Sequence, residues 1–190
     1  MGSRRFPGKA MAEIAGKPSV YWTVSRARAS GFQVVLATTD APEDAVLEGV
    51  ARLAGVGFFR GPEHAARRML MVCEAEGASH VIRVTGDDIF VDPDLMRRAV
   101  EMHIQHGSDY TTMPAVSRGW DSEVISRIAL YWAAQNDETE MLGNVLPKLP
   151  IKRFVTALST PFKPPMELNT EEDMDRIREY VSARTEALSV

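Results

Sequence analysis

The chain has 190 residues, and at about 150 residues per domain this length favours one domain that spans residues 1–190. Hydrophobic residues make up 45% and charged residues 25%, which excludes disordered, collagen-like and disulfide-scaffold proteins. The formal charge of −4, from 22 basic and 26 acidic side chains, provides no overall positive field that would recruit nucleic acid.

Cysteine content and hydropathy limit the cellular setting. Cys73 is the only cysteine, which excludes an intrachain disulfide and a multi-cysteine zinc site. No apolar run approaches the roughly 20 residues of a membrane span, and the first residues lack the apolar segment of a signal peptide. We therefore expect a cytoplasmic protein that binds neither membranes nor nucleic acid.

The first half of the chain alternates short apolar segments with amphipathic ones. Apolar runs that end in polar residues predict buried strands, and apolar residues at helical spacing after Pro42 and Pro93 predict helices. The predicted elements are strand 32–38, helix 42–54, strand 57–60, helix 62–76, strand 79–85 and helix 93–106. Such strand–helix–strand units are typical of parallel strands, so we expect a three-layer α/β domain.

The second half is less regular, and its topology stays open. The predicted elements are strand 109–113, strand 120–124, helix 126–135 and strand 154–159. Asn169 or Thr170 can cap a last helix with an acidic first turn, in which Met174 and Ile177 begin an apolar stripe.

Ligands of an open α/β sheet bind at the carboxyl ends of its strands, which directs attention to polar residues at those ends and in nearby loops. The first such place is the N-terminal stretch 1–9, where small residues permit close backbone approach and Arg4, Arg5 and Lys9 supply positive charge. This composition is typical of a phosphate-binding loop. A basic terminus without fixed structure would have the same composition.

Two further places carry acidic residues. Asp87 and Asp88 follow the predicted strand 79–85, where adjacent carboxylates can hold Mg²⁺, although aspartates are also common in turns and helix caps. Asp121 and Glu123 alternate with apolar residues and so share one face of a predicted strand. An exposed polar strand edge would give the same pattern.

Several motifs in order along the chain resemble those of the acylneuraminate and KDO-type cytidylyltransferases. Within that family the chain is most similar to the spore coat polysaccharide biosynthesis protein F branch. The matching stretches are residues 1–9, 14–18, 37–44, 59–61, 83–87, 92–93, 121–124 and 168–173.

The resemblance implies a fold and an activity. The fold is the Rossmann-like nucleotide-diphospho-sugar transferase fold with a mostly parallel sheet. Its first strand is expected to be truncated here, because the family has an apolar strand and an arginine ahead of Met1-Gly2-Ser3. The activity is transfer of CMP from CTP to an acidic sugar with release of pyrophosphate, in surface polysaccharide or glycan biosynthesis.

The resemblance also implies residue roles. Gly2, Ser3, Arg5 and Lys9 would bind the triphosphate, with Arg5 and Lys9 as catalytic counter-charges and Asp87 as the main Mg²⁺ ligand. Asn169 stands where the family has a second metal-binding aspartate, and an amide binds Mg²⁺ more weakly than a carboxylate does. The remaining expected contacts are Thr39, Asp40, Arg60 and Thr85 with the nucleotide, and Asp121 and Glu123 with the sugar.

Two alternatives use the same fold. One is a degenerate, non-catalytic nucleotide-binding protein, which Asn169 and the expected loss of a strand would favour. The other is a nucleotide-sugar-dependent glycosyltransferase with a metal-binding Asp-x-Asp motif. Asp92-Pro93-Asp94 has that spacing, but its position at a predicted helix start favours a cap. The sugar, the base and the oligomeric state stay open, with a homodimer as one option.

Overall fold

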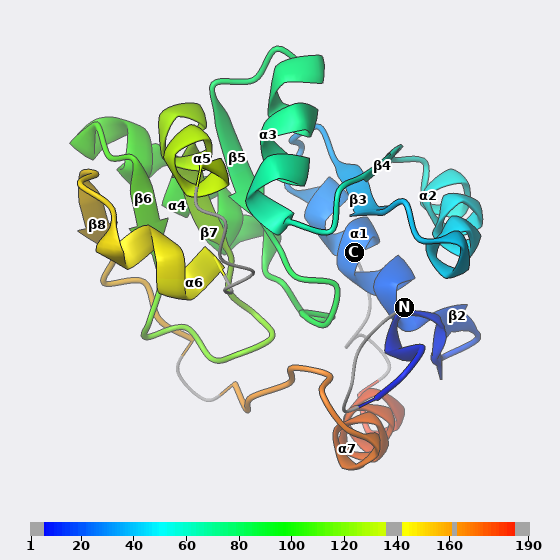
Figure 1. Cartoon of the computed structure of the whole chain (residues 1–190). Helices are drawn as coiled ribbons and strands as arrows, with labels where there is room; N and C mark the ends of the chain where they lie inside the picture. Colours follow the sequence, from blue (N-terminus) through cyan, green and yellow to red (C-terminus); the bar gives the residue numbers. More distant parts are fainter. Residues whose placement is uncertain (1–5, 136–141, 161–162, 185–190) are drawn as a thin grey trace.

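Two groups of strands form the centre of the molecule in the computed structural model, which describes residues 6–135, 142–160 and 163–184 (Figure 1). The smaller sheet pairs β3 (Val35–Thr39) with β4 (Gly57–Gly61) in parallel. The larger sheet has the order β5 (His80–Arg83), β7 (Glu123–Ser126), β6 (Tyr110–Thr112), β8 (Arg153–Val155).

Strand direction follows from the connections. β3 and β4 are joined through a helix and run parallel, as the predicted strand–helix–strand unit requires. β7 runs antiparallel to β6, and no helix lies between the two to carry the chain back to its starting edge. β7 also runs antiparallel to β5 on its other side. β6 and β8 are parallel.

The two sheets are not joined by strand pairing between β3 and β5. In the described residues ahead of β3, the only strands are β1 (Glu13–Ile14) and β2 (Lys17–Pro18), which pair with each other as a short hairpin. The described residues before β3 therefore add no third strand to the smaller sheet.

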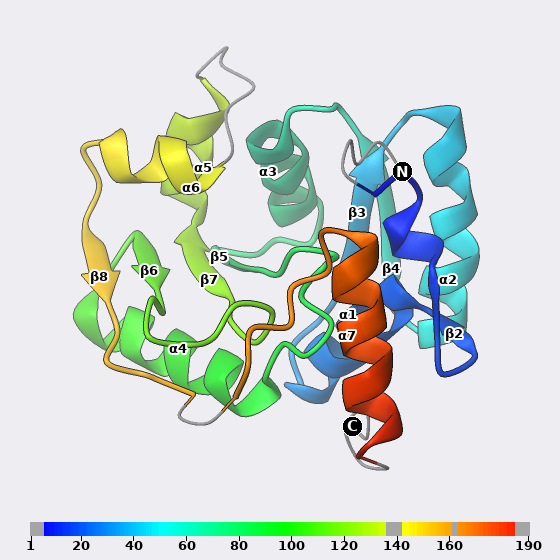
Figure 2. The ribbon, with the colours of Figure 1, turned by 90° about the horizontal axis from the view of Figure 1, so that it is seen from below.

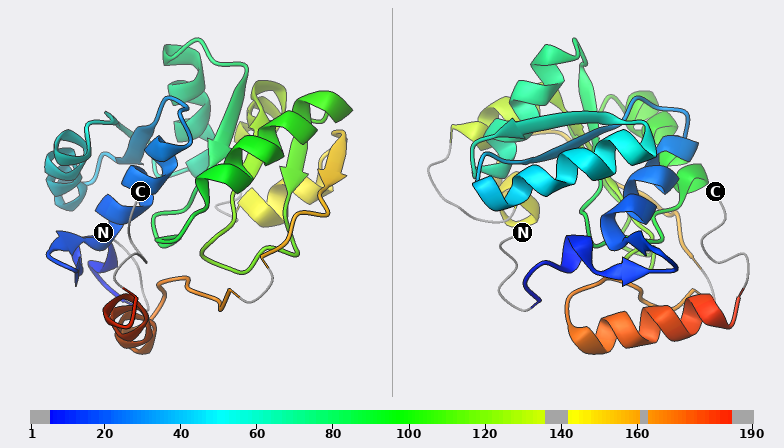
Figure 3. Two further views of the ribbon diagram at one scale, coloured as in Figure 1. Left: turned by 180° about the vertical axis from the view of Figure 1, so that it is seen from behind. Right: turned by 90° about the vertical axis from the view of Figure 1, so that its right-hand side faces the viewer.

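Helices cover both faces of the strands, which confirms the expected three layers (Figure 2, Figure 3). On one face lie α3 (Ala65–Ala75) and α5 (Arg127–Ala134), which contact each other. On the other face lie α1 (Ser19–Ala29), α2 (Leu47–Ala54) and α4 (Pro93–His106), with α1 in contact with both of the others. The shorter helical elements are η1 (Lys9–Met11), η2 (Pro42–Val46), α6 (Leu142–Val145) and η3 (Leu146–Lys148).

The last helix, α7 (Glu171–Ser182), ties the C-terminal part to the N-terminal hairpin. Its buried Ile177 belongs to the same apolar cluster as Ile14 of β1, Phe90 and Trp120. Arg178 adds a hydrogen bond of 3.0 Å from Nη2 to the backbone oxygen of Glu13. The β1–β2 hairpin and α7 are therefore held side by side.

Local sequence explains the helix ends. Asp92 caps α4 through its side chain, which accepts from the backbone of Asp94 and Leu95, and Pro93 occupies the first turn. This geometry supports the helix-cap interpretation of Asp92. Thr170 and Asp173 form a capping box at the start of α7, which confirms Thr170 as the cap.

Several elements differ from the sequence prediction. The hairpin β1–β2 and the short elements η1, α6 and η3 were not predicted, and the predicted strand 154–159 is β8, which ends at Val155. α1 was not predicted, the predicted strand 120–124 begins only at Glu123 and continues to Ser126, and the predicted helix 42–54 starts as the 3₁₀ turn η2. Across the ranges that the structure describes, no helix has both the length and the apolar character needed to span a bilayer.

Candidate active site

The loop that follows β5 separates the roles of its two aspartates. Asp88 is 8% exposed and accepts hydrogen bonds from the backbone and the hydroxyl of Thr85, so it fixes the turn. Burial, together with the charges of Asp87 and Asp121, raises the pKa of Asp88 to about 7, although the hydrogen bonds from Thr85 lower it. The turn interpretation thus fits Asp88, whereas Asp87 is left to face other segments of the chain.

The segment before α7 runs beside this loop. The backbone nitrogen of Leu168 donates to the backbone oxygen of Asp87 at 3.1 Å, and that of Met166 donates to Arg118 at 2.8 Å. Met166 and Leu168 are buried, whereas Glu167 and Asn169 are half-buried. This alternation indicates that Glu167 and Asn169 share the other side of the extended segment.

A glycine permits the close approach of this segment. Gly119 has a φ of +87°, and a Cβ atom there would lie 2.5 Å from the carbonyl carbon of Met166 and 2.7 Å from the backbone nitrogen of Glu167. No other residue type fits this contact without moving the segment. Gly119 therefore sets the position of Glu167 relative to the loop after β5.

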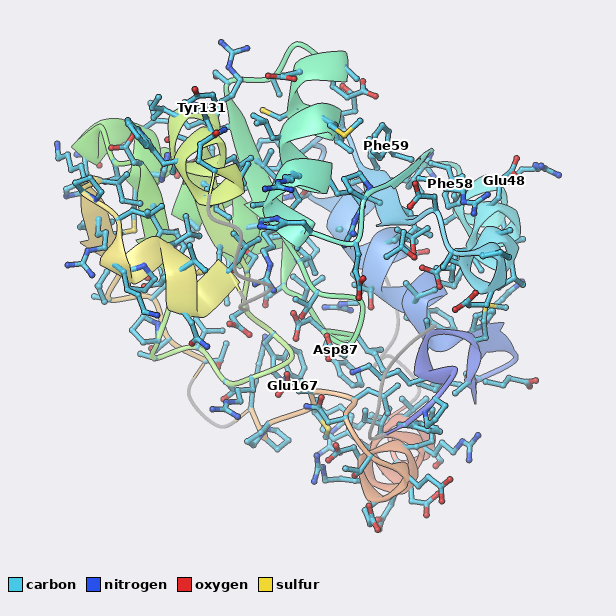
Figure 4. The ribbon with its side chains drawn as sticks, viewed as in Figure 1. Glu48, Phe58, Phe59, Asp87, Tyr131 and Glu167 are labelled. Atoms are coloured by element: carbon cyan, nitrogen blue, oxygen red, sulfur yellow. The ribbon has the colours of Figure 1, made fainter. Side chains whose placement is uncertain are left out.

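Three carboxylates come together at this place. Asp87, Asp88 and Glu167 each have an oxygen atom within 4.8 Å of the others. Figure 4 labels Asp87 on the loop after β5 and Glu167 on the segment before α7. The sequence argument missed Glu167, although its position two residues before Asn169 in an extended segment was a usable signal. Burial, together with the charges of Glu123 and Glu167, also raises the pKa of the nearby Asp121.

Lys9 enters the same cluster from the N-terminal segment. Its Nζ donates to Oδ2 of Asp87 at 2.6 Å, to the backbone oxygen of Leu168 at 2.8 Å and to Oδ1 of Asn169 at 3.4 Å. Three residues singled out in the sequence, Lys9, Asp87 and Asn169, are thus in direct contact. Gly2, Ser3 and Arg5 lie outside the described residues.

The expected nucleotide contacts at the end of β3 lie in another loop, which side-chain hydrogen bonds hold in place. Arg60 Nη2 donates to the backbone oxygens of Asp40 at 2.6 Å and Ala41 at 3.0 Å. The hydroxyl of Thr39 donates to Oδ2 of Asp44 at 2.6 Å, and Asp40 is exposed. In the described part of the chain Arg60 therefore orders this loop.

The expected sugar contacts differ from each other in environment. Asp121 lies before β7 instead of within it and is half-buried. Glu123 is the first residue of β7 and links two partners, because its carboxylate accepts from Arg83 and from the hydroxyl of Tyr110. Burial and the neighbouring Glu123 raise the pKa of that Tyr110 hydroxyl. Thr85 contacts Asp88, as described above.

Comparison with known proteins gives one consistent result. A family model described as cytidylyltransferase matches residues 1–189. The spore coat polysaccharide biosynthesis protein SpsF of Bacillus subtilis is 31% identical over 94% of this chain and 81% of its own length. The 3-deoxy-manno-octulosonate cytidylyltransferase of Idiomarina loihiensis is 35% identical over 53% of this chain and 41% of its own length.

Solved structures show the same fold. A cytidylyltransferase from Leptospira borgpetersenii superposes with a TM-score of 0.84 at 22% identity, over 97% of this chain and 84% of that chain. A CMP:2-keto-3-deoxy-manno-octonic acid synthetase complexed with CTP gives 0.71 at 16% identity, over 96% and 95%. The manganese complex of Rv0371c from Mycobacterium tuberculosis gives 0.69 at 18% identity, over 93% and 94%.

Proposed function

The chain belongs to the cytidylyltransferase family and is a nucleotidyltransferase enzyme, and we propose that it transfers CMP from CTP to a hydroxyl of an acidic sugar. The relatives that match it include a polysaccharide biosynthesis protein and an enzyme named for a sugar acid, which supports such an acceptor. Its product would serve surface polysaccharide or glycan biosynthesis. Residues 1–190 are proposed to act as one domain, and a cytoplasmic location accords with the free, buried Cys73.

The observation that carries the proposal is the contact of Lys9 with Asp87 and Asn169. The ammonium of Lys9 and the oxygen atoms of Asp87 and Asn169 meet at the end of β5, and an open α/β sheet binds its ligands at such strand ends. The glycosyltransferase alternative loses its metal-binding motif, and the non-catalytic alternative loses the part of its support that came from Asn169. Asp92 serves as the cap of α4, and Glu167 adds a carboxylate to the cluster that Asn169 adjoins.

The donor set fits a hard divalent cation. Asp87, Glu167 and Asn169 offer oxygen atoms only, as Mg²⁺ and Mn²⁺ prefer. We propose Mg²⁺ as the metal, with Asp87 and Asn169 as ligands and Glu167 beside them. When bound, the ion would neutralise charge on the phosphates of CTP.

The reaction moves negative charge onto oxygen atoms that the chain must stabilise. The sugar hydroxyl oxygen bonds to the α-phosphorus of CTP and gives up its proton to water, the bond from that phosphorus to the bridging oxygen breaks, and pyrophosphate leaves. Lys9, with Arg5, is proposed to donate hydrogen bonds to the phosphates and balance this charge. The proposed triphosphate contacts also include Gly2 and Ser3.

The remaining residues are proposed to orient the two substrates. Thr39, Asp40, Arg60 and Thr85 lie at or near strand ends and would contact the nucleotide. Asp121 and Glu123 would contact the sugar, with Glu123 held in place by Arg83 and Tyr110.

Pyrophosphate release tests the proposal. Purified protein is incubated with CTP, Mg²⁺ and a panel of acidic sugars that includes 3-deoxy-manno-octulosonate, with neutral sugars and with ATP, GTP and UTP as controls. We expect release with CTP and an acidic sugar, and loss of release in Asp87→Asn. Release only with a neutral sugar, or only with another nucleotide, would overturn the assignment of substrates.

We also propose a homodimer. Ile104, Ile128 and Tyr131 are about half exposed and line one groove beside the end of α4 and α5, which a second copy would cover. Figure 4 labels Tyr131 on α5. Light scattering on the full chain measures the mass directly, and a monomer at all concentrations would contradict this proposal.

A further inference from the structure

A positive charge already occupies the oxygen cluster that we propose for the metal. Lys9 Nζ lies 2.6 Å from Asp87 Oδ2, 2.8 Å from the Leu168 backbone oxygen and 3.4 Å from Asn169 Oδ1. The side chains of Lys9 and Asp87 are 19% and 15% exposed. Oxygen atoms from two segments thus surround one ammonium group away from bulk water, in the way that oxygen ligands surround a hard cation.

Hydrogen bonds hold the backbone of Lys9, whereas its side chain can change direction by rotation once its own hydrogen bonds break. The hydroxyl of Ser19, at the start of α1, donates to the backbone oxygen of Lys9 at 2.6 Å, and Lys9 donates from its backbone nitrogen to Phe6 at 3.2 Å. The lysine stem has four carbons and rotates about each bond. Nζ can therefore leave the cluster while the N-terminal segment keeps its place.

Two cations cannot share these oxygen atoms. A magnesium ion binds oxygen at about 2.0–2.1 Å, and Nζ already lies 2.6 Å from Oδ2 of Asp87. The two positive charges would then lie within a few ångströms of each other in a half-buried site, where repulsion is screened less than in water. Metal binding at Asp87 therefore requires Lys9 to move.

The triphosphate of the nucleotide gives Lys9 an alternative partner. Once Nζ leaves Asp87, its charge needs another anion, and the proposed function places phosphate oxygens beside the N-terminal segment. A phosphate accepts charged hydrogen bonds at least as well as a carboxylate does. The nucleotide phosphates thus replace Asp87 as the anionic partner of Lys9, and the carboxylate of Asp87 becomes available to the metal.

We propose that Lys9 is a built-in competitor of the metal, whose ammonium holds the cation position until a triphosphate draws it away. Metal and nucleotide then bind cooperatively, and each raises the affinity of the other by the same factor. The part that concerns the nucleotide rests on the proposed function. The competition between Lys9 and the metal does not, and it can be measured with no nucleotide present.

The test is a titration of the full chain with Mn²⁺ alone, in which the electron paramagnetic resonance signal reports free Mn²⁺. Lys9→Met removes the competing charge, and Lys163→Met is the matched control. Lys163 is also paired with an aspartate, Asp92, at 2.8 Å. We expect Lys9→Met to bind Mn²⁺ about tenfold more tightly than the wild type, the scale of one hydrogen bond to a charged group, and Lys163→Met to match the wild type.

The double variant Lys9→Met with Asp87→Asn locates the effect. We expect this double variant to show no gain in Mn²⁺ affinity, because the carboxylate of Asp87 that the loss of Lys9 would expose is absent. Circular dichroism establishes that each variant is folded. The inference is overturned if Lys9→Met binds Mn²⁺ no more tightly than the wild type, if Lys163→Met gains as much, or if the double variant keeps the gain.

The nucleotide arm uses calorimetry of CTP binding with and without Mn²⁺. Formation of the Mn²⁺–CTP complex in solution is the same for every variant, so it cancels in the comparison. We expect Mn²⁺ to strengthen CTP binding more in the wild type than in Lys9→Met, and equal coupling would contradict the inference. Failure of the proposed function looks different, since CTP would then not bind while the gain with Mn²⁺ alone would persist.

Discussion

The buried imidazole of His103 makes the stability of the fold sensitive to acid. His103 lies in α4, is fully buried, and contacts the hydroxyl of Thr111 through Nδ1 at 2.8 Å. Within the described residues its Nε2 has no hydrogen-bond partner. Burial, together with the nearby His80, lowers the pKa of His103 to about 4, and Asp109 opposes this shift.

The lowered pKa fixes the sign of the effect. An unfolded histidine titrates near about 6.5, so between that pH and about 4 the unfolded chain binds more protons than the folded one. The free energy of unfolding must therefore fall as the pH falls through this window. From these two pKa values His103 alone contributes a loss of about 2 kcal/mol between about pH 7 and pH 5.

Urea unfolding at a series of pH values measures this slope. His103→Gln keeps a polar end near Thr111 but cannot take up a proton, so we expect it to be less stable at pH 7 and to lose less stability on acidification. His106→Gln is the matched control, because His106 lies on the same helix and is exposed. A slope in His103→Gln equal to that of the wild type would refute the reasoning.

Three further predictions concern the site. Asp87→Asn should abolish pyrophosphate release and leave the circular dichroism spectrum unchanged, and activity near the wild-type rate would contradict its role. Lys9→Ala should weaken CTP binding by about 1.5–3 kcal/mol, which calorimetry measures, and unchanged affinity would remove Lys9 from the phosphate contacts. Gly119→Ala should lower the unfolding free energy by about 1–3 kcal/mol or more through its clash with Met166. Gly77→Ala shares the positive φ, has no atom within 4 Å of the added Cβ, and should cost less.

Local patterns were enough to predict most elements. The predicted helix 93–106 has the bounds of α4, because Asp92, Pro93 and Gly107 mark its ends and its apolar residues keep helical spacing. α1 escaped prediction because valine, threonine and aromatic residues, which form helices poorly, make up much of it. Its buried Val20, Thr23, Val24 and Ala27 do recur at helical spacing.

The strand directions were harder to predict than the strands themselves. The alternation of strands and helices in the first half correctly indicated parallel β3 and β4. The antiparallel course of β7 depends on how the chain crosses from β6 over residues 113–122, where no periodic pattern exists. Such a crossing is decided by tertiary contacts such as those of Gly119, which a single sequence does not display.

Residue types alone could not pair the members of the site. From the sequence, the stretch around Lys9 could equally be an unstructured basic terminus, and Asp87-Asp88 could equally be turn residues. In the structure Asp88 fixes a turn, whereas Asp87 contacts Lys9. Glu167 was missed because a glutamate in a proline-rich stretch indicates a site only when it is considered together with Asn169, two residues later. The alternation of Glu167 and Asn169 with buried residues, in a segment beside the loop of Asp87, puts Glu167 in the site.

The three clustered carboxylates explain why the site needs a cation both without ligands and with metal and nucleotide bound. Asp87, Asp88 and Glu167 approach within 4.8 Å, and Asp87 and Leu168 are brought together from segments about 80 residues apart in the chain. Like charges at this separation repel, and burial strengthens the repulsion. In the free protein the ammonium of Lys9 offsets it and also connects the N-terminal segment to both acidic segments. A metal ion that replaces Lys9 must therefore neutralise the carboxylates in its place, while the released Lys9 binds the phosphates of the nucleotide. The carboxylate charges that hold the site together thus also couple the binding of metal and nucleotide.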